Sequence, residues 1–567
     1  MIDKHWITRP VDQEQVIALA ESLGLSPITA KVLWGRGVRD SVHARQWLSD
    51  SGGPGHDPFL LPDMEQSVDR LQQAIQQQEY ICFYGDYDVD GISATSLHLS
   101  FFRSLGAQAE VYIPHRQEEG YGLNEGAIRK LADRKVSVMV TADCGTTSPH
   151  EIALAQRLGI DVIVTDHHQF QEEVPEPFAF VNPYRSDNLY PFQSLCSGGL
   201  AYKVVEAYYR KFGGGDVSPV DGLDLVALSS VADVVPLRDE NRSFVREGLR
   251  QLTEGTRCGI RALKQVLGIT GSCSASTIGF RFAPVINAAG RLAHADLGVR
   301  LLTSTSDAEA LSLAQKLEQL NRQRREIEQE IFEEAKACVE EAGESPVIVV
   351  GKRGWHLGVV GIVASRLVER YHRPAVVVAF NQDGVGKGSA RSVPGYNVFD
   401  ALAQCQEHLL AFGGHPAAAG LTVASQVFSG LQDKMAEVAV KDMNADSKAP
   451  ILEIDADIQL SELQPRLLKE FDSLDPFGMG NPEPTLSATG VTVLEKRIVG
   501  DNHLKLVVRQ NGSVPIECIG FRMGEWLSKI HGSGLQFDVA FMPEINRWKG
   551  YDRIQLRMRD FRKSRGS

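Results

Sequence analysis

The first half of the chain alternates short apolar runs with longer stretches that have the length of helices. The runs at 80–84 (YICFY), 136–142 (VSVMVTA) and 161–165 (DVIVT) are rich in β-branched and aromatic residues. Such runs are typical of strands that are buried on both faces of a sheet. A helix-length stretch, SATSLHLSFFRSLG, follows Gly91. The pattern predicts βαβ units and an α/β fold with a parallel sheet.

One uninterrupted helix is predicted from Asp307 to Ala342, because its apolar residues recur at near-heptad spacing and it contains no Pro or Gly. At 1.5 Å per residue this helix would be about 54 Å long, which is enough to bridge two domains. Arg322, Arg324 and Arg325 interrupt the apolar stripe. Two interpretations remain open: these side chains contact nucleic acid, or they pair with the glutamates at 326, 328 and 330.

The second half of the chain predicts two further domains. The runs SPVIVVG and PAVVVAF indicate a smaller α/β domain, and five later strand-like runs separated by turns indicate a small barrel, for which an OB fold fits the length. The loop DPFGMGNPEP is expected to anchor this barrel to the main domain. Residues 1–40 look helical and accessory. The expected divisions are 1–40, 41–303 for the main domain, 304–343 for the connecting helix, 344–440 and 450–567.

Acidic residues and a histidine pair follow the predicted strands. In open parallel sheets, ligands bind beyond the carboxyl ends of the strands, so these side chains are expected to converge on one crevice. They are Asp86, Asp88 and Asp90 in GDYDVDG, Asp143 in VTADCG, Asp166, His167 and His168 in VTDHH, and Asp233 in SSVADVVPL.

This residue set favours a divalent metal. Carboxylates with one or two imidazoles suit Mg²⁺ or Mn²⁺, and no set of cysteines indicates a structural zinc. So many gathered carboxylates would repel one another without cations, and two ions are therefore expected. A pair of ions roughly 3.5 to 4 Å apart can activate a water and stabilise the leaving oxygen of a phosphoryl displacement. The sequence thus predicts a phosphoesterase.

Each of these residues also has a simpler interpretation. The segment from Asp86 opens like an EF-hand calcium loop, but that loop requires a Glu at its twelfth position, where this chain has Leu97, and a helix before it. A single Asp such as Asp143 or Asp233 is usually a turn or helix cap. Of the pair His167 and His168, one is expected to bind a metal and the other to face a phosphate, although one could be a core histidine.

The motifs DYDVDG, ADCG, DHH and ADVVPL, in this order, resemble the four motifs of the DHH phosphoesterase superfamily. Four later blocks resemble its bacterial RecJ-type branch of single-strand-specific DNA exonucleases: GWHLGVVGIVASRL, GKGSARS, GGHPAAAG and DPFGMGNPEP. The resemblance extends over about residues 35–565, which is nearly the whole chain. One departure is the pair Ser229 and Ser230, where members commonly carry Gly-Thr before the Ala-Asp pair; it removes no ligand.

The resemblance implies a 5′ to 3′ exonuclease that hydrolyses single-stranded DNA to mononucleotides in repair and recombination. It also implies that two Mn²⁺ or Mg²⁺ ions are held, with Asp143 bridging, while Asp86 and Asp166 orient the ligands and His168 contacts the scissile phosphate. The implied protein partners are a single-strand-binding protein and a DNA helicase. The implied metal ligands are Asp88, Asp90, Asp143, His167 and Asp233.

Candidate DNA contacts lie further along the chain. The resemblance implies that Ser389 and Arg391, with Arg116, hold the 5′ phosphate, and that His415 lies near the strand. The segment FRFAPVINAAGRL at 280–292 is either a close-approach site for DNA or an ordinary surface loop; its polar residues are Arg281, Asn287 and Arg291.

The C-terminal tail is strongly basic. Residues 547–567 hold eight Lys or Arg against two Asp and include Trp548, a composition that suits a groove for stacking unpaired bases. A solvated terminal strand pair is the alternative interpretation. The net charge of −13 is unusual for a protein that contacts phosphates, so basic residues are expected to collect along one groove.

Composition fits a large enzyme with several cores. The chain has 567 residues, 43% of them hydrophobic, and no apolar run approaches the roughly 18 residues that span a bilayer. The start, MIDKHWITRP, does not resemble a signal peptide. Eight cysteines without CxxC pairing indicate reduced thiols, and a cytoplasmic protein without a membrane partner is expected.

Two rival functions remain. The first is a hydrolase of oligoribonucleotides or small phosphoesters from the same superfamily, but such an activity would not explain the long helix and the barrel. A catalytically silent scaffold that binds single strands would be expected to have lost metal ligands, and none is missing.

Overall fold

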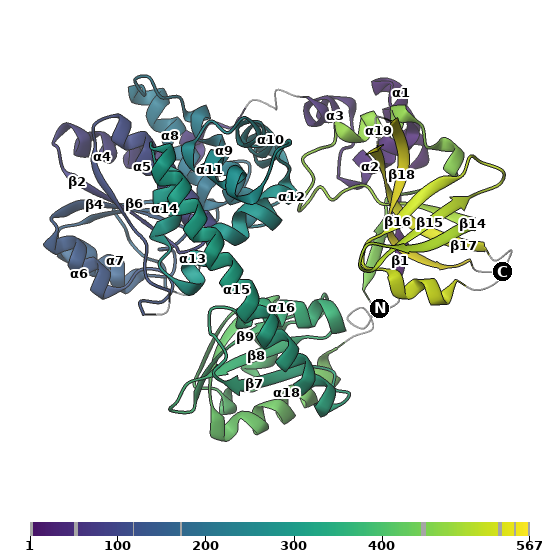
Figure 1. Cartoon of the computed structure of the whole chain (residues 1–567). Coiled ribbons are helices and arrows are strands. Elements are labelled where there is room, and N and C mark those ends of the chain that lie inside the picture. Colours follow the sequence, from purple (N-terminus) through teal and green to yellow (C-terminus); the bar gives the residue numbers. More distant parts are fainter. Residues whose placement is uncertain are drawn as a thin grey trace.

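The structure is a computed structural model that describes residues 4–49, 55–116, 118–170, 173–443, 450–530, 536–548 and 551–564, without the side chains at 547, 548, 551 and 552. Two α/β domains lie at the two ends of one long helix, and a barrel carries both chain termini (Figure 1). Within the described ranges no single helix is long and apolar enough to cross a membrane; helices α1 and α2 pass that test only together, and they are bent by 115°. All eight cysteines are free thiols.

The first α/β domain is built on a parallel sheet, as predicted, and this sheet has five strands. Helices α6 (Glu125–Asp133) and α7 (Pro149–Arg157) pack on one face, and α4 (Met64–Gln76), α5 (Val89–Ser104) and α8 (Ser197–Phe212) pack on the other. The predicted runs at 80–84, 136–142 and 161–165 are its three central strands. In spatial order the strands are β3 (Gln108–Tyr112), β2 (Tyr80–Gly85), β4 (Val136–Ala142), β5 (Asp161–Thr165) and β6 (Ala179–Val181).

A helical layer completes this domain and corrects one interpretation. Residues 278–292 are not a surface loop, because they form the π-helix η3 (Ile278–Phe282) and α13 (Ala283–Leu292). The small residues serve close packing: a Cβ on Gly290 would lie 2.7 Å from the carbonyl oxygen of Tyr87. The other helices of the layer are α9 (Leu223–Ala232), α10 (Asp239–Glu254), α11 (Cys258–Leu267), α12 (Ala275–Thr277) and α14 (Asp296–Thr303).

The connecting helix α15 (Asp307–Ala342) has the predicted bounds. Its first half packs into the core of the first domain and its second half into the second domain. Its arginines form ion pairs along the helix, Arg324 with Glu328 at 2.7 Å and Arg325 with Glu318 at 3.0 Å. The ion-pair interpretation is therefore confirmed for Arg324, whereas Arg322 and Arg325 pair with Glu318, which precedes them on the helix, and not with the expected glutamates.

The second α/β domain has a mixed five-stranded sheet in which only β7 and β8 are parallel. Helix α16 (Val360–Tyr371) and α15 cover one face; α17 (Val398–Ala403) and α18 (Phe428–Asp442) cover the other. Their glycines make the segments GKGSARS and GGHPAAAG look like turns in the sequence, but both are largely strand. In spatial order the strands are β10 (Ala411–His415), β11 (Ala418–Ala424), β9 (Val385–Arg391), β8 (Ala375–Phe380) and β7 (Ile348–Arg353).

The C-terminal domain is a barrel, because β14 pairs with both β15 and β17 and so closes the sheet. The short helix α19 (Pro465–Asp472) packs beside it. Its strands, in the order of the sheet, are β13 (Ala456–Asp457), β14 (Leu486–Val499), β15 (His503–Arg509), β16 (Ile516–Gly520), β18 (Tyr551–Lys563) and β17 (Gln536–Trp548).

The N-terminal segment belongs to this barrel. Strand β1 (His5–Thr8) pairs in parallel with β12 (Ile451–Ile454), and the helices α1 (Gln13–Leu23), α2 (Pro27–Gly35) and α3 (Ser41–Leu48) share the barrel's hydrophobic core. The division expected at residue 41 thus falls inside this unit, since Trp47 of α3 is part of the same core.

The loop that links the barrel to the first domain is held by one buried side chain. The Arg242 guanidinium of α10 donates to the backbone carbonyls of Ser473, Leu474 and Asp475. The backbone N–H of Leu237 donates to the carbonyl of Met479 at 2.7 Å. These bonds place the loop DPFGMGNPEP against the end of α9, as an anchor for the barrel.

Several basic residues of the C-terminal tail form ion pairs within the barrel domain. Arg557 and Arg559 both bond to Glu483, and Arg562 lies 3.3 Å from Asp538. The side chain of Trp548 lies outside the described residues. These ion pairs offset part of the basic charge that was expected to collect along one groove.

Candidate active site

The carboxyl ends of three neighbouring strands carry the acidic residues. Asp86 follows β2, Asp143 follows β4 and Asp166 follows β5. The imidazole of His167 stands at their centre: its Nε2 lies 3.1 Å from Asp143 Oδ1, 3.5 Å from Asp90 Oδ2 and 3.8 Å from Asp233 Oδ2. The structure thus brings together side chains from positions 86 to 233 of the sequence.

The GDYDVDG segment turns from β2 into α5. Asp88 is the N-cap of α5, and its Oδ1 accepts hydrogen bonds from the backbone N–H groups of Asp90, at 2.8 Å, and Gly91. Asp90 lies in the first turn and accepts from the N–H groups of Ser197 and Gly198, both at 2.9 Å, at the start of α8. These bonds fix both carboxylates in place before any ligand is bound.

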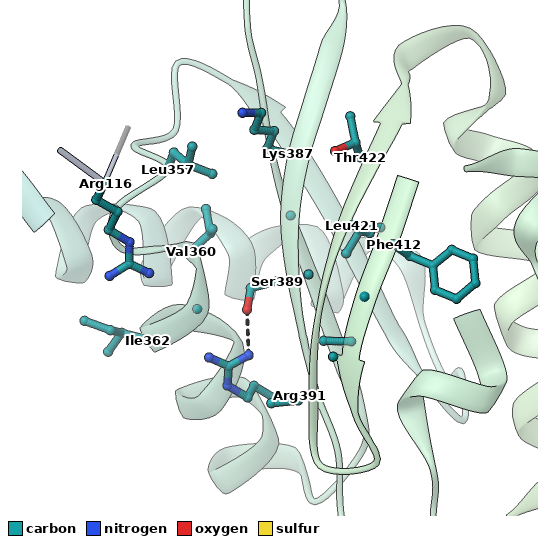
Figure 2. A pocket seen from close by; sticks show the side chains of 18 of the residues that line it. Arg116, Leu357, Val360, Ile362, Lys387, Ser389, Arg391, Phe412, Leu421 and Thr422 are labelled. Atoms are coloured by element: carbon teal, nitrogen blue, oxygen red, sulfur yellow. Dashed lines mark hydrogen bonds between the residues drawn. The ribbon is translucent and has the colours of Figure 1, made fainter. Parts of the chain in front are cut away.

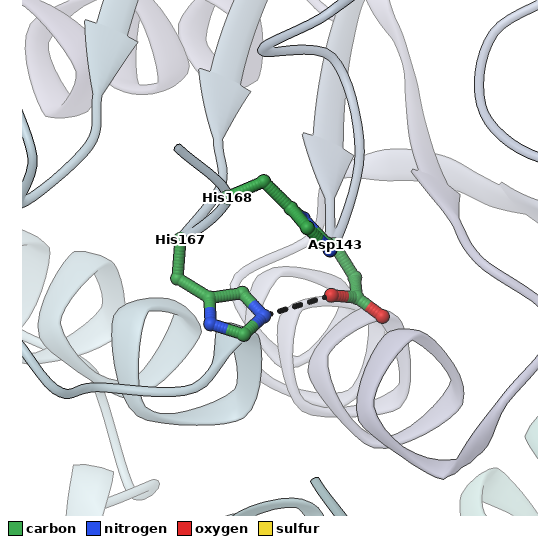
Figure 3. A group of neighbouring side chains, drawn as sticks. All are labelled: Asp143, His167 and His168. Atoms are coloured by element: carbon green, nitrogen blue, oxygen red, sulfur yellow. Dashed lines mark hydrogen bonds and ion pairs between the residues drawn. The ribbon is translucent and has the colours of Figure 1, made fainter. Parts of the chain in front are cut away.

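Asp143 has a left-handed backbone, with a φ of 67°. Its Oδ1 accepts a hydrogen bond from the Ser197 hydroxyl at 3.1 Å and faces His167 Nε2 (Figure 3). Tyr121 donates to the carbonyl of Asp143 at 3.0 Å and covers the side of His168.

Asp166 stands behind the two histidines and bonds to the protein with both oxygens. One oxygen accepts from the N–H of Thr146 at 3.0 Å, and the other accepts from the N–H of His167 and from His168 Nδ1, at 2.8 and 2.7 Å. Burial alone would raise the pKa of Asp166, but the hydrogen bond and charge of His168 hold it below its usual value. Burial alone would lower the pKa of His168, but Asp166 raises it to about 9.

Three groups of side chains place their ligand atoms within 4.8 Å of one another. Asp143 belongs to two of them and His167 to two, which is the arrangement expected of shared ligands. Asp166 belongs to none. The groups are Asp143, His167 and His168; Asp90, His167 and Asp233; and Asp86, Asp88 and Asp143.

The unbalanced negative charge fits a divalent cation. Burial and mutual repulsion raise the pKa values of Asp86, Asp88 and Asp143, and burial and the charge of Asp90 raise that of Asp233 to about 8. One oxygen of Asp86 is buried without a hydrogen-bond partner. Hard oxygen and imidazole ligands that need positive charge are the donor set preferred by Mg²⁺ and Mn²⁺.

These raised pKa values predict how stability depends on pH. A carboxyl whose pKa is higher in the folded than in the unfolded chain favours folding below about pH 4, and this contribution is lost as pH rises through the folded-state value. Without divalent cations, the thermal midpoint is therefore expected to fall as pH rises from about 4 toward 8. Excess Mn²⁺ should cancel most of this fall, because it stabilises the ionised carboxylates. Thermal melts with and without chelator check both expectations; a midpoint that rises over this window without cation would contradict them.

A cavity of about 770 Å³ lies between the two α/β domains, next to the carboxylates. We call it the interdomain cavity. Arg116 enters it from the first domain, and Ser389 and Arg391 enter it from β9 (Figure 2). Arg291 of the first domain also lines it. Tyr87, which stands between Asp86 and Asp88, also lines it. The cavity and the acidic site therefore share a wall.

The interdomain cavity is electropositive. Burial and the charge of Arg116 lower the pKa values of Arg291, to about 10, and of Arg391. Arg391 donates to the Ser389 hydroxyl at 2.6 Å, and Arg291 donates across the domain boundary to the carbonyl of Gly358 at 2.9 Å. Three guanidinium groups gathered around one cavity make a site for an anion such as a phosphate.

The remaining candidate residues are dispersed. Asn287 accepts a hydrogen bond from the N–H of Val89 at 3.0 Å and so supports the turn that carries Asp88. Arg281 donates instead to the carbonyl of Leu267 at 2.5 Å, outside the residues that line the cavity. His415 is exposed at the end of β10 and is also outside that lining.

Sequence reasoning missed the residues that hold the ligands. Ser197 donates to Asp90 through its N–H and to Asp143 through its hydroxyl. The N–H of Gly198 and the Ser229 hydroxyl both donate to Asp90. The departure at Ser229 is therefore a hydrogen-bond donor beside the site. The sequence carries one local signal of this contact, the run of small residues at 197–199. These residues allow α8 to approach Ser229 closely, since a Cβ on Gly198 would lie 2.3 Å from Ser229 Oγ.

Comparison with known proteins agrees with this architecture. Three family models match: "DHH family, N-terminal domain" at residues 80–229, "DHHA1 domain" at 344–441 and "RecJ OB domain" at 454–560. These matches confirm the predicted fold class.

Full-length relatives are also similar. The "Single-stranded-DNA-specific exonuclease RecJ" of Bacillus subtilis is 38% identical over 98% of this chain and 70% of its own length, and that of Escherichia coli is 33% identical over 94% and 95%. The crystal structure of Thermus thermophilus RecJ in complex with Mn²⁺ covers 99% of this chain, with 79% of that chain matched, at 27% identity and a TM-score of 0.85. A structure of the same protein with Mg²⁺ has a TM-score of 0.79. The chain belongs to the RecJ family of single-stranded-DNA-specific exonucleases.

Proposed function

We propose that this protein is a metal-dependent exonuclease that hydrolyses single-stranded DNA from its 5′ end and releases mononucleotides in DNA repair and recombination. One observation carries the proposal: the carboxylate and histidine site shares the wall at Tyr87 with an arginine-lined cavity. A terminal phosphate held by arginines next to a hydrolytic site is what an enzyme needs to cut one nucleotide from a strand end.

We assign roles to the chain's own residues. Asp88, Asp90, Asp143, His167 and Asp233 would hold two Mn²⁺ or Mg²⁺ ions, with Asp143 shared. When bound, such a pair supplies an activated water and charge stabilisation for the leaving oxygen. His168 is held by Asp166 and has a raised pKa, which supports a protonated imidazole that donates to the scissile phosphate. Asp86, which follows β2, would orient the neighbouring ligands Asp88 and Asp143.

The 5′ polarity rests on the interdomain cavity. A terminal monoester phosphate carries more negative charge than an internal diester, so the cluster of Arg116, Arg291 and Arg391 would favour a strand end. Ser389 orients Arg391 within the cavity. Single-stranded DNA is the proposed partner, and a single-strand-binding protein and a DNA helicase are proposed from the family resemblance. The eight free thiols support a reducing, cytoplasmic compartment.

The proposal is tested with one oligonucleotide labelled at either end, in the presence of Mn²⁺. A 5′ label should appear at once as a mononucleotide, while a 3′ label should remain on a ladder of shortening strands. Blunt duplex DNA should be degraded much more slowly, because a duplex is too wide for the cleft. Equal rates on duplex and free strand, or early release of the 3′ label, would contradict the proposal.

The same assay separates the rival functions. A 3-mer and a 40-mer should both be degraded, whereas a small-phosphoester hydrolase would act on the short substrate only. Arg391→Gln should raise KM by about tenfold for strands with a 5′ phosphate and less for strands with a 5′ hydroxyl, because the lost contact is to the terminal phosphate. Arg129→Gln on the exposed side of α6 is the control and should change neither value.

A further inference from the structure

A second cavity, of about 510 Å³, lies on the Asp233 side of the acidic site and has no role in the proposed hydrolysis. Three parts of the chain form most of it, namely the turn after α9, the segment from α12 through η3 to α13, and the loop before the barrel; Arg324 of α15 and Ile362 of α16 complete it. Three apolar side chains on it are unusually open, with Phe280 80% exposed and Val234 and Met479 each 55% exposed. We call it the Val234–Phe280–Met479 groove.

This groove continues from the interdomain cavity. Arg291 and Ile362 line both. The residue that precedes Val234 is Asp233, one of the gathered carboxylates. A ligand that has a phosphate at the acidic site and extends past Asp233 must therefore enter the groove.

Val234 has an unusual backbone for its residue type. Helix α9 ends in a Schellman arrangement: the N–H of Val235 donates to the carbonyl of Ser230 at 3.2 Å, and the N–H of Val234 donates to that of Val231. The residue at this position is normally Gly, because its φ is positive. Here it is a β-branched residue with a φ of 60°. A glycine would relieve this strain, so the retained valine side chain points to a use for it.

The second wall of the groove is also unusual. Phe280 lies in the π-helix η3, a rare element that is frequent at functional sites. Its ring packs little against the protein. The carbonyl of Met479 accepts from the N–H of Leu237, so the backbone of the third wall is fixed while its side chain stays open.

We propose that the Val234–Phe280–Met479 groove is a nucleobase subsite. It binds one unpaired base of the strand whose scissile phosphate lies at the acidic site, with the base stacked against Phe280. This assignment rests on the proposed function. The occupant follows from the surroundings: a largely apolar groove with one exposed aromatic ring, beside arginines and the gathered carboxylates, fits a ligand with an apolar face and an attached phosphate. A paired base is excluded, since its faces are covered by its stacked neighbours.

The first test uses Phe280→Ala with intact and abasic strands. Each strand carries one abasic residue, placed in turn at the first four nucleotides from the 5′ end. The unaltered protein should show a KM raised about tenfold at one abasic position, which is the size expected of one stacked base. Phe280→Ala should raise the KM for the intact strand by a similar factor, with little change in kcat. For this variant, the strand that is abasic at the sensitive position should have the same KM as the intact strand. Leu189→Ala, at an exposed position in the same domain, should behave as the unaltered protein.

The second test uses Val234→Gly, which separates substrate contact from support of the fold. If Val234 contacts a base, the substitution raises KM several-fold while the thermal midpoint stays equal or rises, because glycine suits the positive φ. If Val234 only supports the turn at Asp233, the midpoint and the Mn²⁺-induced shift fall and KM is unaffected, which overturns the proposal.

The outcomes distinguish the subsite from the proposed function. If Phe280→Ala hydrolyses all strands and its KM stays within twofold of that of the unaltered protein, the base subsite is overturned and the proposed function stands. Absence of hydrolysis by the unaltered protein in Mn²⁺ overturns the proposed function, and the subsite falls with it.

Discussion

Asp143→Asn is expected to lower kcat by at least about 10³-fold, which corresponds to about 4 kcal/mol of transition-state stabilisation. Asp143 belongs to two of the three ligand groups, so its loss affects the whole cluster. Asn is the suitable replacement, because it has nearly the same shape and tolerates the positive φ of 67° that would strain Ala.

The same substitution should also stabilise the cation-free protein. The pKa of Asp143 is raised by burial and by repulsion from Asp90 and Asp88, so a neutral amide removes an unfavourable charge at neutral pH. The thermal midpoint with chelator should therefore be equal or higher, while the increase in midpoint on adding Mn²⁺ should largely disappear. Activity and stability are expected to change in opposite directions.

Asp224→Asn is the matched control. Asp224 is as buried as Asp143, but it pairs with Arg257 at 2.8 Å, away from the ligand groups. Removal of one partner of a buried ion pair destabilises by about 3–5 kcal/mol. The midpoint should fall, with the Mn²⁺-induced shift retained. Turnover by Asp143→Asn near that of the unaltered protein would show that the assigned metal centre is wrong.

The parts of the structure that the sequence predicted are those set by local patterns. The three central strands follow from continuous apolar runs, and α15 follows from 36 residues of helical periodicity with no helix breaker. The acidic residues could be placed because the ends of parallel strands share one edge. Their assignment as metal ligands follows from their residue type alone, because carboxylate oxygens suit Mg²⁺ and Mn²⁺.

The misses concern contacts between distant segments. No periodicity in residues 4–49 indicates that β1 pairs with β12, more than 440 residues later, or that Trp47 packs in the barrel core. Glycine-rich segments were misread for a related reason: Gly386 and Gly388 lie in a strand where a Cβ would collide with Val378 of β8, which only tertiary structure reveals. The small residues at 197–199 indicate a close approach, but only the tertiary structure shows that the N–H of Ser197 donates to Asp90.

Gly91→Ala should abolish activity by moving the segment that carries Asp86, Asp88 and Asp90. A Cβ on Gly91 would lie 2.4 Å from the backbone nitrogen of Asp86 and 2.6 Å from its carbonyl oxygen. Both are main-chain atoms that cannot rotate away, so the turn between β2 and α5 must open. We expect kcat to fall by about 10³-fold or more, because carboxylates displaced by even about 1 Å lose their shared geometry.

Gly126→Ala separates this collision from the general effect of a methyl group in a first helical turn. Gly126 occupies the first turn of α6, where the nearest atom to an added Cβ is Asn124 Oδ1, at 3.4 Å. Alanine favours a helix over glycine by about 1 kcal/mol, so this variant should keep full activity and melt at an equal or slightly higher temperature. In Gly91→Ala the free energy of unfolding should fall by about 1–3 kcal/mol, and the thermal midpoint should fall with it. The increase in midpoint on adding Mn²⁺ should be lost. Normal kcat and a normal Mn²⁺ shift in Gly91→Ala would mean that the turn yields without moving the carboxylates, so their positions would not depend on the close approach of α5 to Asp86.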